Sequence, residues 1–389
     1  MNEGLTSAAA RIRGCGAAVF VDVSALMELA WTGIANVTAN LAREIYRALP
    51  EHSYFFARGV VIDPAALMTA IEEANGAYLE VLLENGFAQL GSIGDFSGVA
   101  AATVGLFPNI KTAHRFFDVE AVVFHDLSAM LMPELHQGWA AHVHTQALAR
   151  DGESSEVVCC VSEATAADAK LYLGLDAERC VVAPLGVRPP PGEEPAQRMN
   201  YAVVLGTVEP RKNLRLVAEY MLNHGDLADR IALVFVGRKG WGQSFDDVFG
   251  ELTINSPWRE SIHFTDFVSE ADKWALLRHA RFAIFPSLFE GFGLPVIEAM
   301  AAGCPVITAR SSSLVEFGLP DEMYFDPFSL SDFGRAFRHM ETMPKNTMAR
   351  LGAALKHQAA RYGWAAFAGT LLNAVAARLE ARERAALTP

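Results

Sequence analysis

Short apolar runs alternate with amphipathic stretches along the chain, and these runs predict strands. Valine, alanine, isoleucine and phenylalanine dominate them, and turn-forming or charged residues bound each one. Short, nearly continuous apolar runs are typical of strands that are buried on both faces. In the first half of the chain they cover residues 17–24, 120–126, 156–162 and 180–187.

The segments between the runs have helical spacing. After Gly33, apolar residues recur three or four positions apart, which places them on one face of a helix. Ser162 precedes the helical pattern of residues 163–174 and is expected to cap that helix. Residues 357–387 are also helical in pattern and end in a charged tail.

A change of composition divides the chain. Proline and glutamate are frequent in residues 187–200, VRPPPGEEPAQRMN, which predicts an exposed linker. Two series of strands and helices separated by a linker predict two doubly wound α/β domains that face one another, each with a covered parallel sheet. Ligands of such sheets bind beyond the C-terminal ends of the strands. After the linker the apolar runs cover residues 201–207, 231–237, 261–268, 281–287 and 304–309.

Composition and charge narrow the class of function. The 389 residues are 51% hydrophobic, which is enough for a core in each half. The formal net charge of −13 argues against a general nucleic-acid binder. No apolar run is long enough to span a membrane, and Asp22 interrupts the early apolar segment, so no signal peptide is expected. The five cysteines lack C-x-x-C spacing, which predicts buried thiols in a reducing cytoplasm, with a redox pair at Cys159–Cys160 as the minor alternative.

Residues 203–221, VVLGTVEPRKNLRLVAEYM, place two cations just ahead of a predicted helix. The preceding strand ends at Gly206, Arg211 and Lys212 follow, and Asn213 stands where an N-cap is expected. A helix N-terminus flanked by cations favours a phosphate or diphosphate ligand. The alternative is a solvated charge pair, but cations oppose the helix dipole at this end, so an anionic ligand would balance them.

Residues 286–307, PSLFEGFGLPVIEAMAAGCPVI, set two carboxylates around a glycine-rich turn. Glu290 precedes a predicted helix and Glu298 lies within it, while Gly291 and Gly293 allow the backbone to approach a ligand closely. Burying a carboxylate is costly unless it accepts hydrogen bonds, and sugar hydroxyls are suitable donors. The alternative is that both glutamates face solvent.

Two positions in the first half are candidates for ligand contact. His125 directly follows a predicted strand, where it would hydrogen-bond a substrate or ease proton movement. A structural histidine with its ring nitrogens satisfied is an equal alternative. Gly33 is expected in the loop before the helix, either touching a ligand held between the domains or forming an ordinary turn.

The segments GTVEPRKNL, FPSLFEGFGLPVIEAMAAGCPVI and SSSLVEF together resemble the family 4 retaining glycosyltransferases, whose fold is GT-B. The E-x7-E spacing from Glu290 to Glu298 is that family's signature. The likeness extends to HDLSAMLMPELH, VSEATAADAK, APLGV and the closing YGW segment, and it is strongest to bacterial enzymes that build surface polysaccharides by mannosyl or hexosyl transfer.

The resemblance implies an α/β architecture of two Rossmann-like domains facing across a cleft. Residues 1–190 would form the acceptor-side domain and residues 191–360 the nucleotide-sugar-binding domain. Residues 361–389 would form a helical segment that packs back on the first domain.

The resemblance also implies roles for individual residues. Lys212 with Arg211 would bind the diphosphate and neutralise the leaving group, Glu298 would accept hydrogen bonds from the ribose, and Glu290 would contact the donor sugar. His125 would lie near the reacting face of that sugar. The residues implied in catalysis are His125, Glu290 and Lys212. Those implied in donor binding are Gly33, Gly206, Arg211, Lys212, Gly291, Phe292, Gly293, Leu294 and Glu298.

One departure and one absence refine this expectation. Many relatives carry arginine directly after the glycine equivalent to Gly206, whereas this chain has Thr207, so Arg211 would replace that charge. No D-x-D triplet occurs, and such triplets bridge a divalent cation to the diphosphate in transferases of the other common fold. A retaining, metal-independent enzyme without a cofactor other than its donor substrate is therefore expected.

The implied reaction moves a hexose, mannose or a related sugar, from a GDP- or UDP-linked donor to a glycan or lipid-linked acceptor in polysaccharide biosynthesis. Its expected location is the cytoplasm at the inner face of the plasma membrane. A soluble small-molecule acceptor is the alternative, because no basic amphipathic helix is evident.

Other classes of protein fit the sequence less well. A nicotinamide-linked oxidoreductase needs G-x-G-x-x-G after the first strand, but Gly14 and Gly16 precede that strand and GFGLPV lacks a third glycine. A glycogen-type phosphorylase needs a lysine for its cofactor, and none stands out. A sugar-nucleotide epimerase of GT-B fold and a catalytically weak sugar-nucleotide-binding protein are the alternatives.

Overall fold

The computed structural model describes most of the chain: residues 2–28, 31, 33–73, 76–86, 88–96, 98–192, 195, 197–238, 240, 242, 245–254, 256–265 and 268–387. The chain divides into two compact units. The first comprises Met1–Leu127, Val143–Gly186 and Gly363–Pro389, and the second comprises Ser128–His142 and Val187–Tyr362. The prediction assigned all of residues 1–190 to one domain, whereas Ser128–His142 associates with the second unit.

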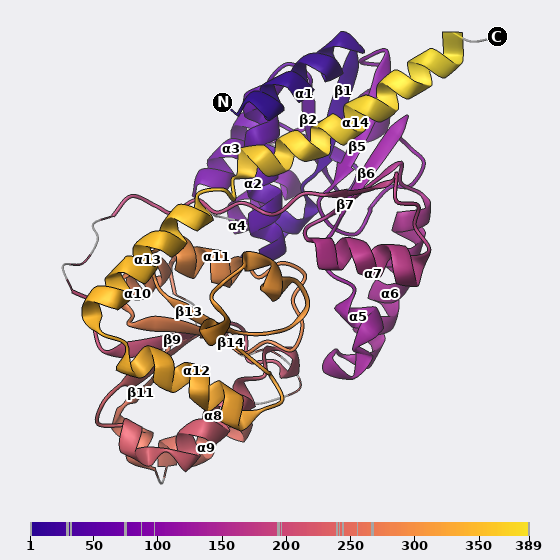
Figure 1. The fold of residues 1–389 in the computed structure, drawn as a ribbon. Helices are drawn as coiled ribbons and strands as arrows, with labels where there is room; N and C mark the ends of the chain where they lie inside the picture. The colour runs from indigo at the N-terminus through magenta and orange to yellow at the C-terminus, as the bar shows by residue number, and fades with distance from the viewer. Residues whose placement is uncertain are drawn as a thin grey trace. The chain divides into compact units, whose positions relative to one another are not determined.

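The first unit is built on an eight-stranded sheet of order β4-β3-β2-β1-β5-β6-β7-β8. Figure 1 labels β1, β2, β5, β6 and β7 of this sheet. Neighbouring strands are parallel from β2 through β8, but β3 pairs antiparallel with both β2 and β4. The expectation of a wholly parallel sheet is therefore wrong at this edge. The strands are β1 Ala17–Asp22, β2 Ser53–Ala57, β3 Val60–Ile62, β4 Gln89–Ser92, β5 Ala102–Phe107, β6 Val119–Phe124, β7 Val157–Cys160 and β8 Cys180–Val182.

The first unit also contains helices and 3-10 turns. Ser162 caps α7 as predicted, because its Oγ accepts a hydrogen bond of 3.0 Å from the Thr165 backbone N–H. The helices are α1 Glu3–Gly14, α2 Gly33–Ala48, α3 Pro64–Glu72, α4 Gly76–Glu84, α6 Gly138–Glu153, whose first residues belong to the second unit, α7 Glu163–Leu173 and α14 Trp364–Leu387, with 3-10 turns η1 Ser24–Met27 and η2 Ile93–Phe96.

The last helix of the chain packs against the first. Helix α14 lies along α1 within the first unit, so the two ends of the sequence share one core (Figure 1). Glu380 accepts two hydrogen bonds from the Arg11 guanidinium, at 2.8 and 2.9 Å. At Gly369 the backbones approach so closely that a Cβ would lie 2.9 Å from the Leu5 nitrogen.

The second unit contains a six-stranded parallel sheet of order β11-β10-β9-β12-β13-β14. The strands are β9 Tyr201–Leu205, β10 Ala232–Val236, β11 Ile262–Thr265, β12 Phe282–Phe285, β13 Val306–Ala309 and β14 Tyr324–Phe325. The helices are α5 Ser128–Leu131, α8 Leu214–Asn223, α9 Phe245–Ile254, α10 Glu270–His279, α11 Leu294–Ala301, α12 Leu330–Thr342 and α13 Lys345–Ala359. The 3-10 turns are η3 Pro133–Leu135, η4 Pro210–Lys212, η5 Gly225–Leu227, η6 Pro257–Glu260, η7 Ser312–Phe317 and η8 Asp321–Met323.

The strand order brings three loops of the second unit to one edge. Strands β9, β12 and β13 are parallel neighbours, so the segments that follow them all leave from the same end of the sheet. The motifs around Lys212, Glu290 and Ser312 stand in these three segments. None of the described helices combines the length and the apolar character needed to cross a membrane.

Candidate functional site

The loop after β9 supplies two cations. Strand β9 ends at Leu205, and Arg211 and Lys212 lie in the turn η4 (Pro210–Lys212) that immediately precedes α8. Gly206 has φ of 148°, and a Cβ there would sit 3.6 Å from the Lys212 side chain. That distance is an ordinary van der Waals contact, so it is the backbone conformation, which L side chains rarely adopt, that favours glycine here.

Glu290, in the loop after β12, joins both cations. Its Oε1 lies 2.6 Å from Lys212 Nζ, and its Oε2 lies 3.0 Å from Arg211 Nη1. All three side chains are about 15% exposed, so the cluster is largely withdrawn from water but still reachable. The structure therefore brings Glu290 to two adjacent cations from which the sequence separates it by almost eighty positions.

The loop after β13 fixes the backbone of Glu290. Ser312 Oγ accepts a hydrogen bond of 2.8 Å from the Glu290 N–H and donates one of 2.7 Å to the Glu290 carbonyl. Ser313 Oγ donates to the same carbonyl at 2.7 Å. Ser312 itself has a left-handed backbone, with φ of 36°, which is uncommon for a residue other than glycine. These contacts fix the main chain from which the Glu290 carboxylate extends.

The cations decide the charge state of Glu290. Burial alone would raise the pKa of this carboxyl, but Lys212 and Arg211 outweigh it and lower the pKa to about 2. Glu290 is therefore ionised at neutral pH. A pre-positioned anion held between two cations can accept hydrogen bonds from hydroxyl groups, and the cations can bind phosphate when they are released.

Glu298 lies on α11 and pairs with a residue that the sequence did not suggest. Its Oε1 is 2.8 Å from Lys273 Nζ on α10, and Lys273 also contacts Glu270 at 2.8 Å. Burial raises the pKa of Glu298, and the neighbouring ammonium of Lys273 only partly offsets this effect. Glu298 is 18% exposed, so it is not a solvent-facing glutamate.

The glycine-rich turn between the two glutamates is held by packing. Gly293 has φ of 99°, and a Cβ there would come within 2.7 Å of the Leu314 side chain. Phe292 is buried and packs edge-on against Phe317, with ring centres 5.5 Å apart. Its side chain therefore belongs to the core, and any donor contact at Phe292 would have to come from its backbone. Gly291 is buried beside it, and Leu294 is the first residue of α11.

The prediction that Asn213 caps the N-terminus of α8 with its side chain is wrong. Asn213 does precede α8, but its side chain makes no capping hydrogen bond. Its backbone is left-handed, with φ of 53°, so the side chain points elsewhere and donates to the Pro327 carbonyl at 2.9 Å. The residue thus ties the start of α8 to the loop after β14.

His125 and Gly33 belong to the first unit. His125 follows β6, and its Nε2 lies 2.7 Å from the Pro108 carbonyl oxygen, which can only accept, so Nε2 carries the proton. Burial lowers the pKa of His125, and the neutral ring is favoured. Gly33 is the first residue of α2 rather than part of the loop before it, and it is exposed.

Three neighbours of the predicted residues were missed. Glu209 contacts Arg211 at 2.8 Å, Ser312 holds Glu290, and Lys273 holds Glu298. Glu209 stands inside the GTVEPRKNL segment and Ser312 inside SSSLVEF, so both were within reach of a motif reading. Lys273 stands 25 positions before Glu298, and no local spacing connects the two.

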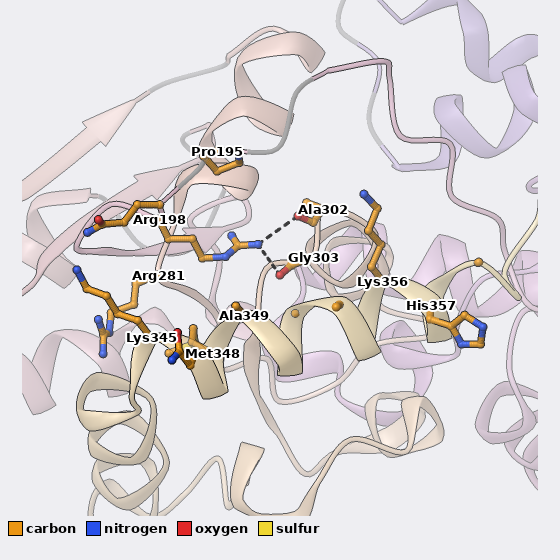
Figure 2. Close-up of a pocket in the computed structure, with 15 residues that line it drawn as sticks. Pro195, Arg198, Arg281, Ala302, Gly303, Lys345, Met348, Ala349, Lys356 and His357 are labelled. Carbon is orange, nitrogen blue, oxygen red and sulfur yellow. Dashed lines mark hydrogen bonds between the residues drawn. The ribbon is translucent and has the colours of Figure 1, made fainter.

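A groove of about 720 Å³ lies elsewhere on the second unit, along α13 (Figure 2). Arg198 reaches across it to the carbonyls of Ala302 and Gly303. Arg281, which also lines it, directly precedes β12, and Gly303 lies shortly before β13. The groove therefore faces the N-terminal ends of these strands, at the opposite edge of the sheet from Lys212 and Glu290, and it is not the candidate site.

The second unit matches a known enzyme family. Residues 191–358 match the family described as glycosyl transferases group 1. The whole chain has the GT-B fold, which Sucrose-phosphate synthase from Thermosynechococcus elongatus shares with a TM-score of 0.65. That structure is 15% identical in sequence, and the match covers 95% of this chain and 100% of that one, so it shows the fold alone.

Two curated relatives match part of the chain. O-antigen chain mannosyltransferase B of Escherichia coli is 30% identical over 222 residues, which are 54% of this chain and 57% of that protein. O-antigen chain mannosyltransferase RfbU of Salmonella typhimurium is 27% identical over 177 residues, which are 45% of this chain and 48% of that protein. The chain thus spans about half the length of these relatives.

Proposed function

We propose that the protein is a retaining glycosyltransferase that moves a hexose from a nucleoside diphosphate sugar to a glycan or lipid-linked acceptor in polysaccharide biosynthesis. The observation that carries the proposal is the ion pair of Lys212 and Glu290, 2.6 Å apart, at the C-terminal edge of a glycosyl transferases group 1 domain. The names of the two relatives favour mannose or a related hexose as the transferred sugar.

In this proposal Lys212 neutralises the diphosphate as it leaves the sugar. Stabilising developing charge with a preorganised cation is the largest electrostatic contribution that such a site can make. Glu290 accepts hydrogen bonds from the donor sugar, and Glu298 accepts them from the ribose. His125, neutral and oriented by Pro108, lies near the reacting face of the sugar, and Gly33 lies near the diphosphate.

We infer that no metal ion is needed, because the charge of the leaving group is met by side-chain cations and the sequence holds no D-x-D triplet. A GDP- or UDP-linked sugar is the only small molecule that the reaction then requires. We place the reaction in the cytoplasm at the inner face of the membrane, where a lipid-linked acceptor would be reached.

The test is the release of nucleotide from donor sugars. The full chain is incubated with GDP-mannose and with UDP-glucose, with and without EDTA, and free GDP or UDP is measured. Slow release that survives EDTA and falls at least about 100-fold in Lys212→Ala supports the proposal. An anomeric proton spectrum of a transfer product would then decide between retention and inversion.

Two alternatives have their own outcomes in the same assay. An epimerase would convert the sugar of the donor and release no acceptor-linked product. A catalytically weak binding protein would release no nucleotide from any donor, and Lys212→Ala would change nothing in that measurement.

A further inference from the structure

Arg211 is held more firmly than a ligand-binding arginine needs to be. Its Nη1 donates to the Phe289 carbonyl at 2.9 Å and to Glu290 at 3.0 Å, and its Nη2 donates to Glu209 at 2.8 Å. Glu209 is 12% exposed and Arg211 15%, so these contacts are shielded from water. A planar guanidinium that satisfies three acceptors in fixed directions has little freedom to turn toward a ligand.

The main chain adds to this attachment. The Leu288 N–H donates to the Arg211 carbonyl at 2.9 Å. Arg211 therefore joins the loop after β9 to the loop after β12 through both its side chain and its backbone. Releasing the guanidinium would break a connection between the two loops that carry the candidate site.

The Lys212 side chain has fewer hydrogen-bond partners than the Arg211 side chain. Among the described residues, Glu290 is the only hydrogen-bond partner of its Nζ, at 2.6 Å. An ammonium is a compact point charge on a flexible stem, so it can exchange one acceptor for another at small cost in geometry. The two neighbouring cations thus differ in how easily a diphosphate can recruit them.

The balance of charges also indicates that Lys212, and not Arg211, is free to bind a diphosphate. The two carboxylates Glu209 and Glu290 balance the two cations Arg211 and Lys212. If a diphosphate draws Lys212 away, Arg211 still neutralises Glu290 and keeps it ionised. If Arg211 left as well, two largely buried carboxylates would lose their shared cation, which is strongly unfavourable.

We propose that Arg211 is a positioning residue that, together with Glu209, fixes the Glu290 carboxylate, and that Lys212 alone of the two cations binds the diphosphate. The inference rests on the proposed function and deepens it. It reassigns Arg211 from donor binding to orientation, and it gives Glu209 a role.

The test compares turnover with nucleotide affinity. The variants are Arg211→Lys, which keeps the charge but cannot span three acceptors, Glu209→Gln, which keeps the shape, and Lys212→Met. Arg230→Met is the matched control, because Arg230 also bridges two carboxylates, Asp226 at 3.1 Å and Glu341 at 3.6 Å, and lies just before β10 at the other edge of the sheet. Turnover is nucleotide release from GDP-mannose or UDP-glucose, and affinity is the Kd for GDP or UDP.

We expect the variants to differ in whether they change kcat or Kd. Arg211→Lys should lower kcat by about 30-fold or more and Glu209→Gln by about threefold to tenfold, each with a Kd within about threefold of the unmodified protein, because a displaced Glu290 harms transfer but not nucleotide binding. Lys212→Met should raise Kd by at least about tenfold. If Arg211→Lys raises Kd as much as Lys212→Met does, or leaves kcat unchanged, the inference is overturned.

A measurement without nucleotide separates this inference from the proposed function. Glu290 is followed by carbon-13 NMR of labelled glutamate carboxyl groups, with Glu290→Gln to assign its signal. Weakening the Arg211 contacts to Glu290 in Arg211→Lys should raise the apparent pKa of Glu290 from about 2. A protein that shows this shift but binds neither GDP nor UDP would contradict the donor site and keep the positioning role of Arg211, whereas an unchanged titration in Arg211→Lys would contradict that role.

Discussion

Glu290 shows how much one residue depends on two others at the candidate site. Its carboxylate is largely buried, yet it stays ionised because Lys212 and Arg211 surround it. The ion pairs make its charge available at neutral pH, and the serines of the next loop fix its backbone. A hydrogen-bond acceptor of this kind is preorganised, so little of the binding energy of a sugar would be spent on arranging it.

The depressed pKa of Glu290 predicts a specific dependence of stability on pH. A carboxyl with a folded-state pKa of about 2 and an ordinary value near 4.5 contributes stability above pH 4.5 that is lost as the pH falls toward 2. The difference corresponds to on the order of 3 kcal/mol. Urea denaturation from pH 6 to pH 3 should therefore show a steeper loss in the unmodified protein than in Glu290→Gln. Glu251→Gln, at an exposed position on α9, is the control, and equal slopes for all three proteins would contradict the prediction.

The two glutamates of the motif should respond differently to substitution. Glu298→Ala should weaken binding of GDP or UDP by about tenfold, because it removes the charge-assisted hydrogen bond that Glu298 is proposed to accept from the ribose. Glu290→Ala should leave the Kd for bare nucleotide within about threefold and abolish most turnover. Lys273 keeps Glu270 as a partner at 2.8 Å, so Glu298→Ala should still fold. Calorimetric titration measures the Kd of both variants. An equal loss of affinity in the two variants would show that the roles are not divided.

At the scale of elements, the sequence predicted strands that consist of a continuous apolar run. Strands β1, β6 and β9 are buried along their whole length, and their valine-rich runs identified them. Strand β4, Gln89–Ser92, is mostly exposed and polar, and β14 has two residues, so neither produces a recognisable pattern. The antiparallel edge of the first unit's sheet is formed by β3 and β4, which were not predicted, whereas β14 pairs parallel with β13.

The candidate site was predictable only in part, and for a related reason. Motif spacing identified Lys212, Glu290 and Glu298, because each stands next to a predicted strand end or helix. The pairing of Glu298 with Lys273 joins two different helices, and the left-handed backbone of Asn213 removed its capping role. Contacts between distant segments and exceptional backbone angles depend on the folded chain, so a sequence pattern does not contain them.

The contact of α1 with α14 leads to a prediction about one glycine. A Cβ on Gly369 would meet the backbone of Leu5 at 2.9 Å, and backbone cannot move aside as a flexible side chain can. Gly369→Ala should therefore lower the free energy of unfolding of the first unit by about 1–3 kcal/mol. Gly363→Ala is the matched control, because a Cβ there would meet nothing within 4 Å. Urea unfolding followed by circular dichroism measures both, and equal midpoints would show that the helices can separate without cost.

At the scale of the whole molecule, the two units carry different parts of the proposed reaction. The second unit holds Lys212, Glu290 and Glu298, and the first holds His125 and Gly33. In this proposal the second unit supplies most of the nucleotide contacts, the first adds Gly33 near the diphosphate, and transfer requires both units. This division can be tested separately from the chemistry.

Hydrogen exchange provides that test. A nucleoside diphosphate that binds only the native state stabilises it by about 2.7 kcal/mol at 100 times its Kd. GDP or UDP alone should slow exchange in the backbone after β9, around Glu290 and near Gly33, which is proposed to lie near the diphosphate, and should leave the segment after β6 unchanged. An unreactive nucleotide-sugar analogue should extend the protection to residues near His125, because His125 is proposed to lie near the reacting face of the sugar. Protection near His125 by the bare nucleotide would place His125 beside the nucleotide, and its absence with the analogue would remove His125 from the reacting face of the sugar.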